Sequence, residues 1–217
     1  MSNHNRTTKN VWIFWLTCIA SAIVLGLITM MNYQNKIDQM IDETGGVVLS
    51  LPKLGSVSPF KFQERSGADL QNADLAGHIW VFNLMFTSCH GPCPLMSHHM
   101  SRLQRSFNGN ELVKFVSLTV DPEVDTLEVL KKYADSYHAR ADQWFFLTGE
   151  KEKIVKFVTK SLKLPAGENP VLHSTRFVLV DANGEVRGYY DSQERAQMER
   201  LKGHIKLLLE SISDQNS

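Results

Sequence analysis

The sequence predicts an α/β domain in which helices flank a central mixed sheet, and three observations support this fold class. Apolar runs of strand length recur along the chain. Between them lie segments whose apolar residues repeat at helical spacing. An Asn-Gly pair separates two further strand-like runs near the C-terminal end, which indicates an antiparallel hairpin. Alternating strands and helices are typical of a sheet that is covered by helices.

The first predicted strand covers residues 79–86, where every residue except Asn83 is apolar. An unbroken run of this length suits a strand that is buried on both faces of a sheet. A cysteine-containing turn follows this strand directly. The helix expected after the turn is indicated by the apolar spacing of Met96, Met100, Leu103 and Phe107.

The same alternation continues to the C-terminal end. Strands are predicted at residues 113–120 and 144–147, and helices at 126–139 and 151–164. The hairpin joins residues 177–180 to residues 185–190 through a type I′ turn at 181–184. The last helix has one apolar stripe, formed by Met198, Leu201, Ile205, Leu208 and Ile212. A strand, cysteine turn and helix at the start, with a hairpin and helix at the end, together resemble the thioredoxin fold.

An uncharged apolar segment of 21 residues, 11–31, precedes the domain. A helix of that length roughly matches the ~30 Å hydrocarbon core of a membrane, so the segment is predicted to be a transmembrane helix. Arg6 and Lys9 lie before it and acidic residues after it, which favours a cytoplasmic N-terminus. A cleaved signal peptide is the alternative, but its apolar region is usually shorter. Cys18 lies within the segment and is interpreted as an ordinary apolar membrane residue.

These features predict four parts: a cytoplasmic tail at 1–10, the anchor at 11–31, a juxtamembrane stem at 32–50 and the domain at 51–217. The short tail leaves little room for a mitochondrial transit peptide. We therefore expect a single-pass protein of a bacterial inner membrane, with its domain in the periplasm. The 23 basic and 23 acidic residues balance, which argues against nucleic acid as a partner.

Two cysteines stand four residues apart, Cys89 and Cys93, where the first predicted strand gives way to a helix. A helix N-terminus favours the thiolate form of cysteine, so both sulfurs are predicted to be activated. Such a pair can share one soft metal ion or oxidise to a disulfide. The alternative is a pair of inert buried cysteines, which is an uncommon choice beside Gly91 and Pro92.

Three stretches of the chain resemble, in order, the signature motifs of the Sco/SenC family of copper-binding proteins. They are FTSCHGPCPLM at 86–96, TVDPEVDTLEVL at 119–130 and HSTRFVLVDANGEVRGYYD at 173–191, and the likeness extends over roughly residues 55–210. The resemblance implies a thioredoxin-like fold. It also implies that copper is bound by Cys89, Cys93 and His173.

The resemblance further implies a role in assembling the binuclear copper centre of cytochrome c oxidase. Its copper-accepting subunit would be the main partner, with other copper chaperones or thiol-disulfide proteins as further partners. Two thiolates favour Cu(I), and a site with an added imidazole also tolerates Cu(II). A structural zinc site would instead have four protein ligands and no open position.

Other polar residues near these motifs have more than one interpretation each. His90 stands where the family often has proline, and is a further ligand, a proton donor or simply a turn residue. On a helical wheel His98 points away from the core and His99 lies on its flank, so both are expected to be non-ligands. Asp121 either tunes the site electrostatically or forms an Asp-Pro turn. The lysines of the helix at 151–164 form a solvated face or a surface for an acidic partner.

Three functions are compatible with the paired cysteines. The first is a copper chaperone, in which His173 is needed. The second is a thiol-disulfide oxidoreductase, in which the two cysteines form a redox pair and His173 is dispensable. A peroxiredoxin-like peroxidase is disfavoured, because no Thr and Arg are assigned beside a single reactive thiolate.

Overall fold

The computed structural model describes residues 21, 23–30, 51–164 and 174–215. The chain divides into two units, residues 1–50 and 51–217. In the first unit, residues 21 and 23–30 are helical. Within the part of the chain that is described, no helix is both long and apolar enough to cross a membrane. Most of the predicted anchor, including Cys18, lies outside the described residues, so the anchor stays a prediction.

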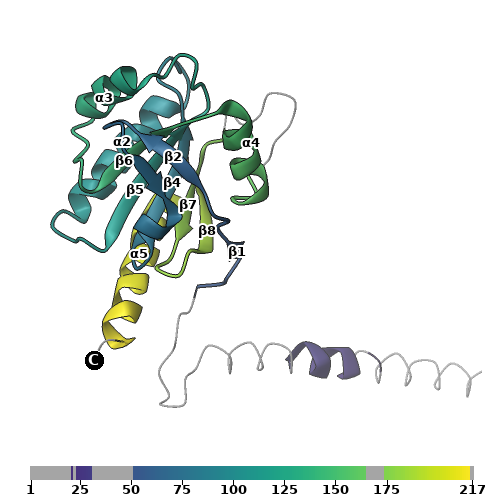
Figure 1. Ribbon diagram of the computed structural model, residues 1–217. Helices are drawn as coiled ribbons and strands as arrows, with labels where there is room; N and C mark the ends of the chain where they lie inside the picture. The colour runs from purple at the N-terminus through teal and green to yellow at the C-terminus, as the bar shows by residue number, and fades with distance from the viewer. Residues whose placement is uncertain (1–20, 22, 31–50, 165–173, 216–217) are drawn as a thin grey trace, which may run out of the picture. The chain divides into compact units, whose positions relative to one another are not determined.

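The second unit contains one eight-stranded mixed sheet with the order β1-β8-β7-β4-β5-β6-β2-β3 (Figure 1). Strands β4 (Ile79–Met85), β5 (Val113–Thr119) and β6 (Trp144–Thr148) run parallel to one another. The remaining strands pair antiparallel with their neighbours: β1 (Gly55–Ser56), β2 (Lys61–Glu64), β3 (Asp69–Gln71), β7 (Arg176–Val180) and β8 (Glu185–Asp191). This arrangement confirms the predicted mixed sheet.

Helices cover both faces of the sheet, as predicted. One face packs against α2 (Cys93–Ser106), α3 (Leu127–Ser136) and α5 (Arg195–Gln215). The other face packs against α4 (Lys151–Lys160) and the short 3-10 helix η1 (Asn72–Leu75). Strand β4 is buried along its whole length, and its side chains alternate between the two faces. We call the first the α2 face and the second the α4 face.

The apolar stripes occupy the core as the sequence predicts. All four stripe residues of the first helix, Met96 to Phe107, are buried on the α2 face. In α5 the stripe packs against the same face, and only Ile212 at its end is half-buried. Two predicted helices end early, because His138 and Lys163 adopt positive φ angles that a right-handed helix cannot contain.

Two features differ from the prediction. The short strands β1, β2 and β3 were not expected, because runs of two to four mixed residues at a sheet edge carry little pattern. The predicted type I′ turn at 181–184 is wrong, since only Gly184 has a positive φ, +77°. The Asp181 carboxylate instead accepts hydrogen bonds from the main-chain N–H groups of Asn183 and Glu185, at 2.9 and 3.0 Å. A three-residue loop with a bulge results.

Candidate functional site

Cys89 and Cys93 come together where β4 ends and α2 begins. Cys89 lies in the loop after β4, and its N–H donates a hydrogen bond to the Phe86 carbonyl at 3.3 Å. Cys93 is the first residue of α2, whose start is set by proline rather than by a side-chain cap. Both thiols are free and buried, with 8% and 3% of the residue exposed. The pair belongs to the apolar core of the α2 face.

The predicted activation of both sulfurs is wrong for Cys93. Burial, and after it a hydrogen bond with Cys89, raise the pKa of the Cys93 thiol to about 12, while the contact with the Phe86 main chain lowers it by less. Desolvation disfavours the charged thiolate more strongly than the helix N-terminus stabilises it. In the reduced, metal-free protein Cys93 therefore keeps its proton, and a reaction at this sulfur has to remove that proton.

A buried carboxylate fixes the loop that leads to the cysteines. Asp125, fully buried, accepts hydrogen bonds from the Thr87 N–H at 3.2 Å to each carboxylate oxygen. The hydroxyls of Thr87 and Thr119 also donate to it. Asp125 thus ties the chain two residues before Cys89 to the end of β5. Asp125 was not among the predicted site residues, although its place after a buried strand, at the same sheet edge as the cysteines, was an available signal.

Asp121, which the sequence analysis singled out, shapes the neighbouring turn. Its carbonyl accepts hydrogen bonds from the N–H groups of Val124 at 3.2 Å and Asp125 at 2.9 Å. Its own N–H donates to the Thr119 hydroxyl at 3.0 Å. The structure therefore shows the turn-forming role, and an electrostatic role for the Asp121 carboxylate stays a prediction.

A tyrosine from α3 completes the surroundings of Cys93. Tyr133 and Ser97 share a hydrogen bond of 2.9 Å between their hydroxyls. Burial raises the pKa of Tyr133, and the proximity of Cys93 adds to this effect. The tyrosine is thus a neutral hydroxyl beside the dithiol. Nothing in its local sequence distinguished it from any other residue on a helix flank.

The histidines are divided between the described and the undescribed residues. His90 and His98 are exposed and His99 is half-buried, which confirms the helical-wheel interpretation of His98 and His99. His173 lies outside the described residues, so its role as a ligand stays a prediction. Within residues 51–164 and 174–215, no three His, Cys, Asp or Glu side chains are grouped as a metal site would require. Of the predicted ligand set, the described part contains the two cysteines.

The donor set suits a soft metal ion as cargo. Two adjacent sulfurs in an apolar setting match the ligand preference of Cu(I), and the same pair can oxidise to a disulfide. Gly91 lies beside Cys89, because a Cβ atom there would be 3.8 Å from the Cys89 Sγ. A larger side chain at this position would crowd the approach to that sulfur.

Comparison with known proteins supports the resemblance to the Sco/SenC family. Residues 51–210 match the SCO1/SenC family. A SCO1 protein homolog of Bacillus subtilis is 34% identical over 168 residues, which cover 75% of this chain and 87% of the relative. A Stutzerimonas stutzeri protein named as copper-binding is 29% identical over 151 residues, covering 65% of this chain and 72% of that protein.

A solved structure agrees with the fold. BsSco, described as a member of the Sco family of cytochrome c oxidase assembly proteins with a disulfide switch, superimposes with a TM-score of 0.65. It is 34% identical, and the match covers 72% of this chain and 95% of BsSco. The α/β mixed sheet described above is accordingly a thioredoxin-like fold, as predicted. The chain belongs to the SCO1/SenC family.

Proposed function

We propose that this protein binds copper and delivers it to the binuclear copper centre of cytochrome c oxidase, and so helps to assemble that centre. One observation carries the proposal: two free thiols lie side by side, buried, at the start of α2. The copper-binding name of the Stutzerimonas relative and the assembly role stated for the family of BsSco support it. The acceptor is the copper-accepting subunit of the oxidase.

Cys89, Cys93 and His173 are the proposed copper ligands, and each has a distinct task. The two sulfurs hold Cu(I), and the imidazole of His173 lets the same site accept Cu(II). Because the raised pKa keeps a proton on Cys93, copper binding releases that proton. Transfer to the acceptor then includes return of a proton to Cys93. Asp125 holds the loop of Cys89 in place throughout this exchange.

Copper stoichiometry of the purified full chain tests the proposal. We expect one copper ion per wild-type chain and weaker binding by at least about tenfold in Cys89→Ser and His173→Ala, because each change removes one ligand. His98→Ala is the matched control, since His98 is an exposed histidine on α2. Unchanged affinity in His173→Ala, or an equal loss in His98→Ala, would remove His173 from the ligand set.

The alternative function is thiol-disulfide exchange, in which Cys89 and Cys93 reduce cysteines of the oxidase copper site or of other exported proteins. The disulfide switch of BsSco favours it. Its redox step would convert the dithiol to a disulfide while the target disulfide gains two electrons and two protons. Full support of oxidase assembly by His173→Ala, with loss in Cys93→Ser, would favour this function over copper delivery.

The proposed setting is a bacterial inner membrane, with residues 11–31 as the anchor and residues 51–217 in the periplasm. Its support is the uncharged apolar segment of 21 residues and the basic residues before it. Extraction of membranes at alkaline pH checks the anchor, because an integral protein stays in the pellet. Release of the full chain into the supernatant would contradict it.

A further inference from the structure

A pocket of about 510 Å³ lies between α2 and the segment that joins β8 to α5. We call it the α2–α5 pocket. It begins in the first turn of α2 at Leu95, two residues beyond Cys93, and Leu95 is 45% exposed although it is apolar. A protein that reaches the cysteines at the start of this helix therefore also meets the mouth of the pocket.

The α2–α5 pocket is lined by more cations than anions. Arg102, Arg195 and Lys202 line it, and Glu199 is the one acidic side chain among its lining residues. Within the described residues, none of these three cations has a hydrogen bond or ion pair through its side chain. Unpaired cations converging on a recess attract an anionic group more strongly than the same charges spread over a surface.

A buried hydroxyl in the same pocket lacks a partner. Ser192 is 1% exposed, and its Oγ makes no hydrogen bond to any described residue. Its main-chain N–H donates a hydrogen bond to the Thr175 carbonyl at 2.8 Å, so only the hydroxyl lacks a partner. A buried donor without an acceptor costs free energy, which an incoming oxygen would recover.

His99 is an uncharged part of this wall. Burial lowers the pKa of His99, Arg102 and His98 lower it further, and a hydrogen bond to the main chain of Ser192 raises it by less. The neutral imidazole is thus held against the segment of Ser192. The arginine and hydroxyl donors of the pocket match the oxygen atoms of a carboxylate.

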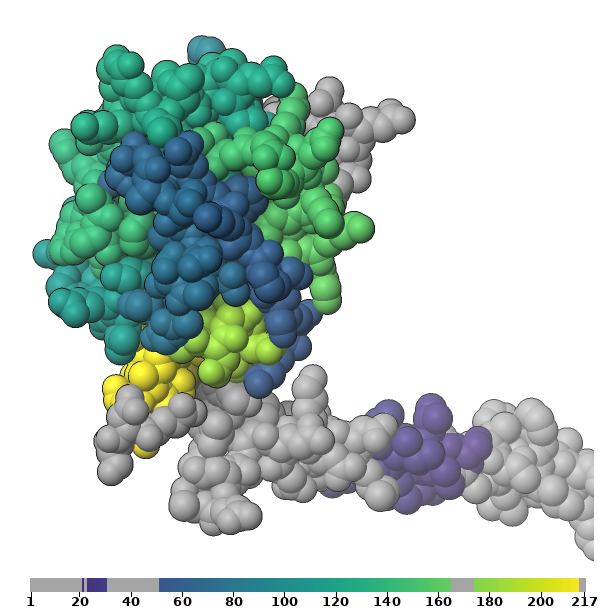
Figure 2. Space-filling view, viewed as in Figure 1, coloured from purple at the N-terminus to yellow at the C-terminus, as the bar shows by residue number. Residues whose placement is uncertain are grey.

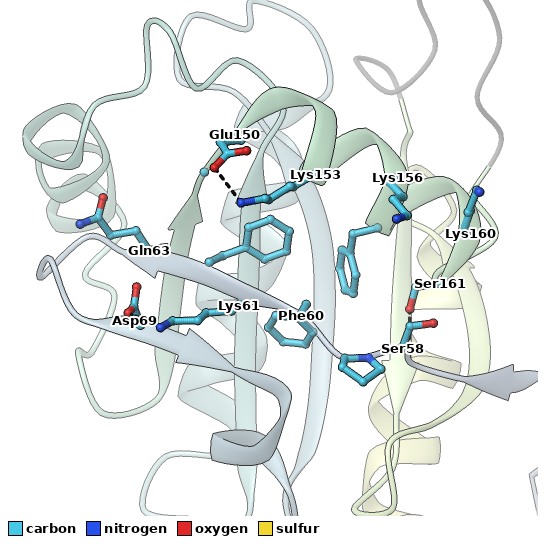
Figure 3. A pocket seen from close by; sticks show the side chains of 14 residues that line it. Ser58, Phe60, Lys61, Gln63, Asp69, Glu150, Lys153, Lys156, Lys160 and Ser161 are labelled. Carbon is cyan, nitrogen blue, oxygen red and sulfur yellow. Dashed lines mark hydrogen bonds and ion pairs between the residues drawn. The ribbon is translucent and has the colours of Figure 1, made fainter.

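A second pocket differs in place. It measures about 690 Å³ and lies between β2 and α4, on the opposite face of the sheet from α2, with Phe60 and Phe157 among its lining residues. Figure 3 shows its lining side chains, Phe60 among them. Two of its lysines are already paired, Lys61 with Asp69 at 2.9 Å and Lys153 with Glu150 at 2.7 Å. Lys156 and Lys160 also line this pocket, which we call the lysine groove. Four lysines and two acids line the groove, so it has an excess of cations as well, but it lies on the face of the sheet away from the dithiol.

We propose that the α2–α5 pocket binds a carboxylate side chain from an acidic segment of the partner protein that approaches Cys89 and Cys93. This inference rests on the proposed function, since it names how the copper acceptor is recognised. The carboxylate contacts Arg102 and Arg195 and accepts a hydrogen bond from Ser192. Leu95 supplies an apolar contact at the mouth, so that recognition combines charge with burial.

Binding of a labelled acidic peptide to the purified full chain tests the inference. The probe is a twelve-residue peptide of alternating glutamate and leucine, and a lysine-leucine peptide is its control. We expect the acidic peptide alone to bind, and the double variant Arg102→Glu/Arg195→Glu to weaken binding by at least about tenfold. Lys156→Glu/Lys160→Glu makes the same charge change in the lysine groove and should alter binding by less than about twofold.

A variant that keeps the net charge separates specific binding from nonspecific electrostatic attraction. Ser192→Ala removes the unpartnered hydroxyl without changing charge, and we expect about threefold weaker peptide binding. Equal weakening by the two charge reversals, or no binding of the acidic peptide to wild type, would overturn the inference. Copper stoichiometry measured on the same variants should be unchanged. A wild-type chain that binds the peptide but no copper would reject the proposed function and keep the pocket.

Discussion

The two faces of the sheet are both closely packed, yet they differ in the side chains that fill them. Among the described residues, the buried methionines and both cysteines of the domain lie on the α2 face. The α4 face contains a cluster of aromatic rings, in which the ring centroid of Phe157 lies 4.9 Å from that of Phe60, in a tilted pair, and 5.4 Å from that of Phe62, in an edge-on pair. Sulfur is thus confined to one face. The α2 face supplies the chemistry, and the α4 face supplies packing.

Two polar groups lie near the dithiol. The buried Asp125 fixes the loop of Cys89, and the Tyr133 hydroxyl lies close enough to Cys93 for that residue to raise its pKa. On the outer surface of the α4 face, β2 and α4 lie side by side, as the blue and green atoms in Figure 2 show, and lysines line the groove between them. Burial of side chains is therefore enough to make a stable face of the sheet. A reactive face also needs polar groups held at defined positions.

The largest expected effect concerns the reactivity of Cys93. Its pKa of about 12, compared with an ordinary value of 9.0, makes its thiolate fraction at pH 7 roughly a thousandfold smaller. We expect alkylation of Cys93 in the reduced, metal-free wild-type protein, followed by mass spectrometry of the peptide that contains Cys93, to be correspondingly slow, with a rate that still rises above pH 10. Because burial is the main cause, unfolding in denaturant should restore ordinary reactivity. A rate that levels off below pH 9 in the folded protein would contradict the assignment.

The next largest effect is expected on the α4 face. Phe157→Ala removes a buried ring that touches Phe60, Phe62 and Phe82, and should reduce the free energy of unfolding by about 3–5 kcal/mol. Phe157→Leu, which keeps most of the volume, should cost about 1 kcal/mol. Denaturant unfolding measures both. If Phe157→Ala also changed the alkylation rate of Cys93 in the folded protein, the two faces would not be independent.

A smaller effect on stability, with a local effect on the site, is expected for Asp125→Asn. The change keeps the size of the side chain and weakens hydrogen bonds that a charged acceptor makes strong, which should cost about 2 kcal/mol. The loop of Cys89 should loosen, so that Cys89 is alkylated faster. Asp121→Asn is the matched control and should change stability by less than about 0.5 kcal/mol. Equal effects of the two variants would show that Asp125 has no special role.

The sequence was sufficient for features that depend on local pattern. The strands β4 to β7 were predicted because each is an apolar run, β8 because an Asn-Gly pair precedes it, and the cysteine pair because four-residue spacing at a strand end is itself a signal. Asp125 bonds the loop before Cys89 and Tyr133 lies near Cys93, each from a separate element, so these contacts exist only after folding. The thiolate prediction for Cys93 failed for a related reason. A helix start is visible in sequence, but the depth of burial that opposes it is not.

The smallest effect is expected at the β7–β8 turn, away from the packing of both faces. Gly184 has a φ of +77°, and a Cβ atom added there would meet nothing within 4 Å. Gly184→Ala should therefore cost about 1 kcal/mol in unfolding free energy, through backbone strain alone. Gly184→Asn should cost less, because asparagine tolerates this conformation. If the Gly184→Ala variant were as stable as wild type, the loop would close without a left-handed residue at this position. The hydrogen bonds to the Asp181 carboxylate would then be enough to hold the loop.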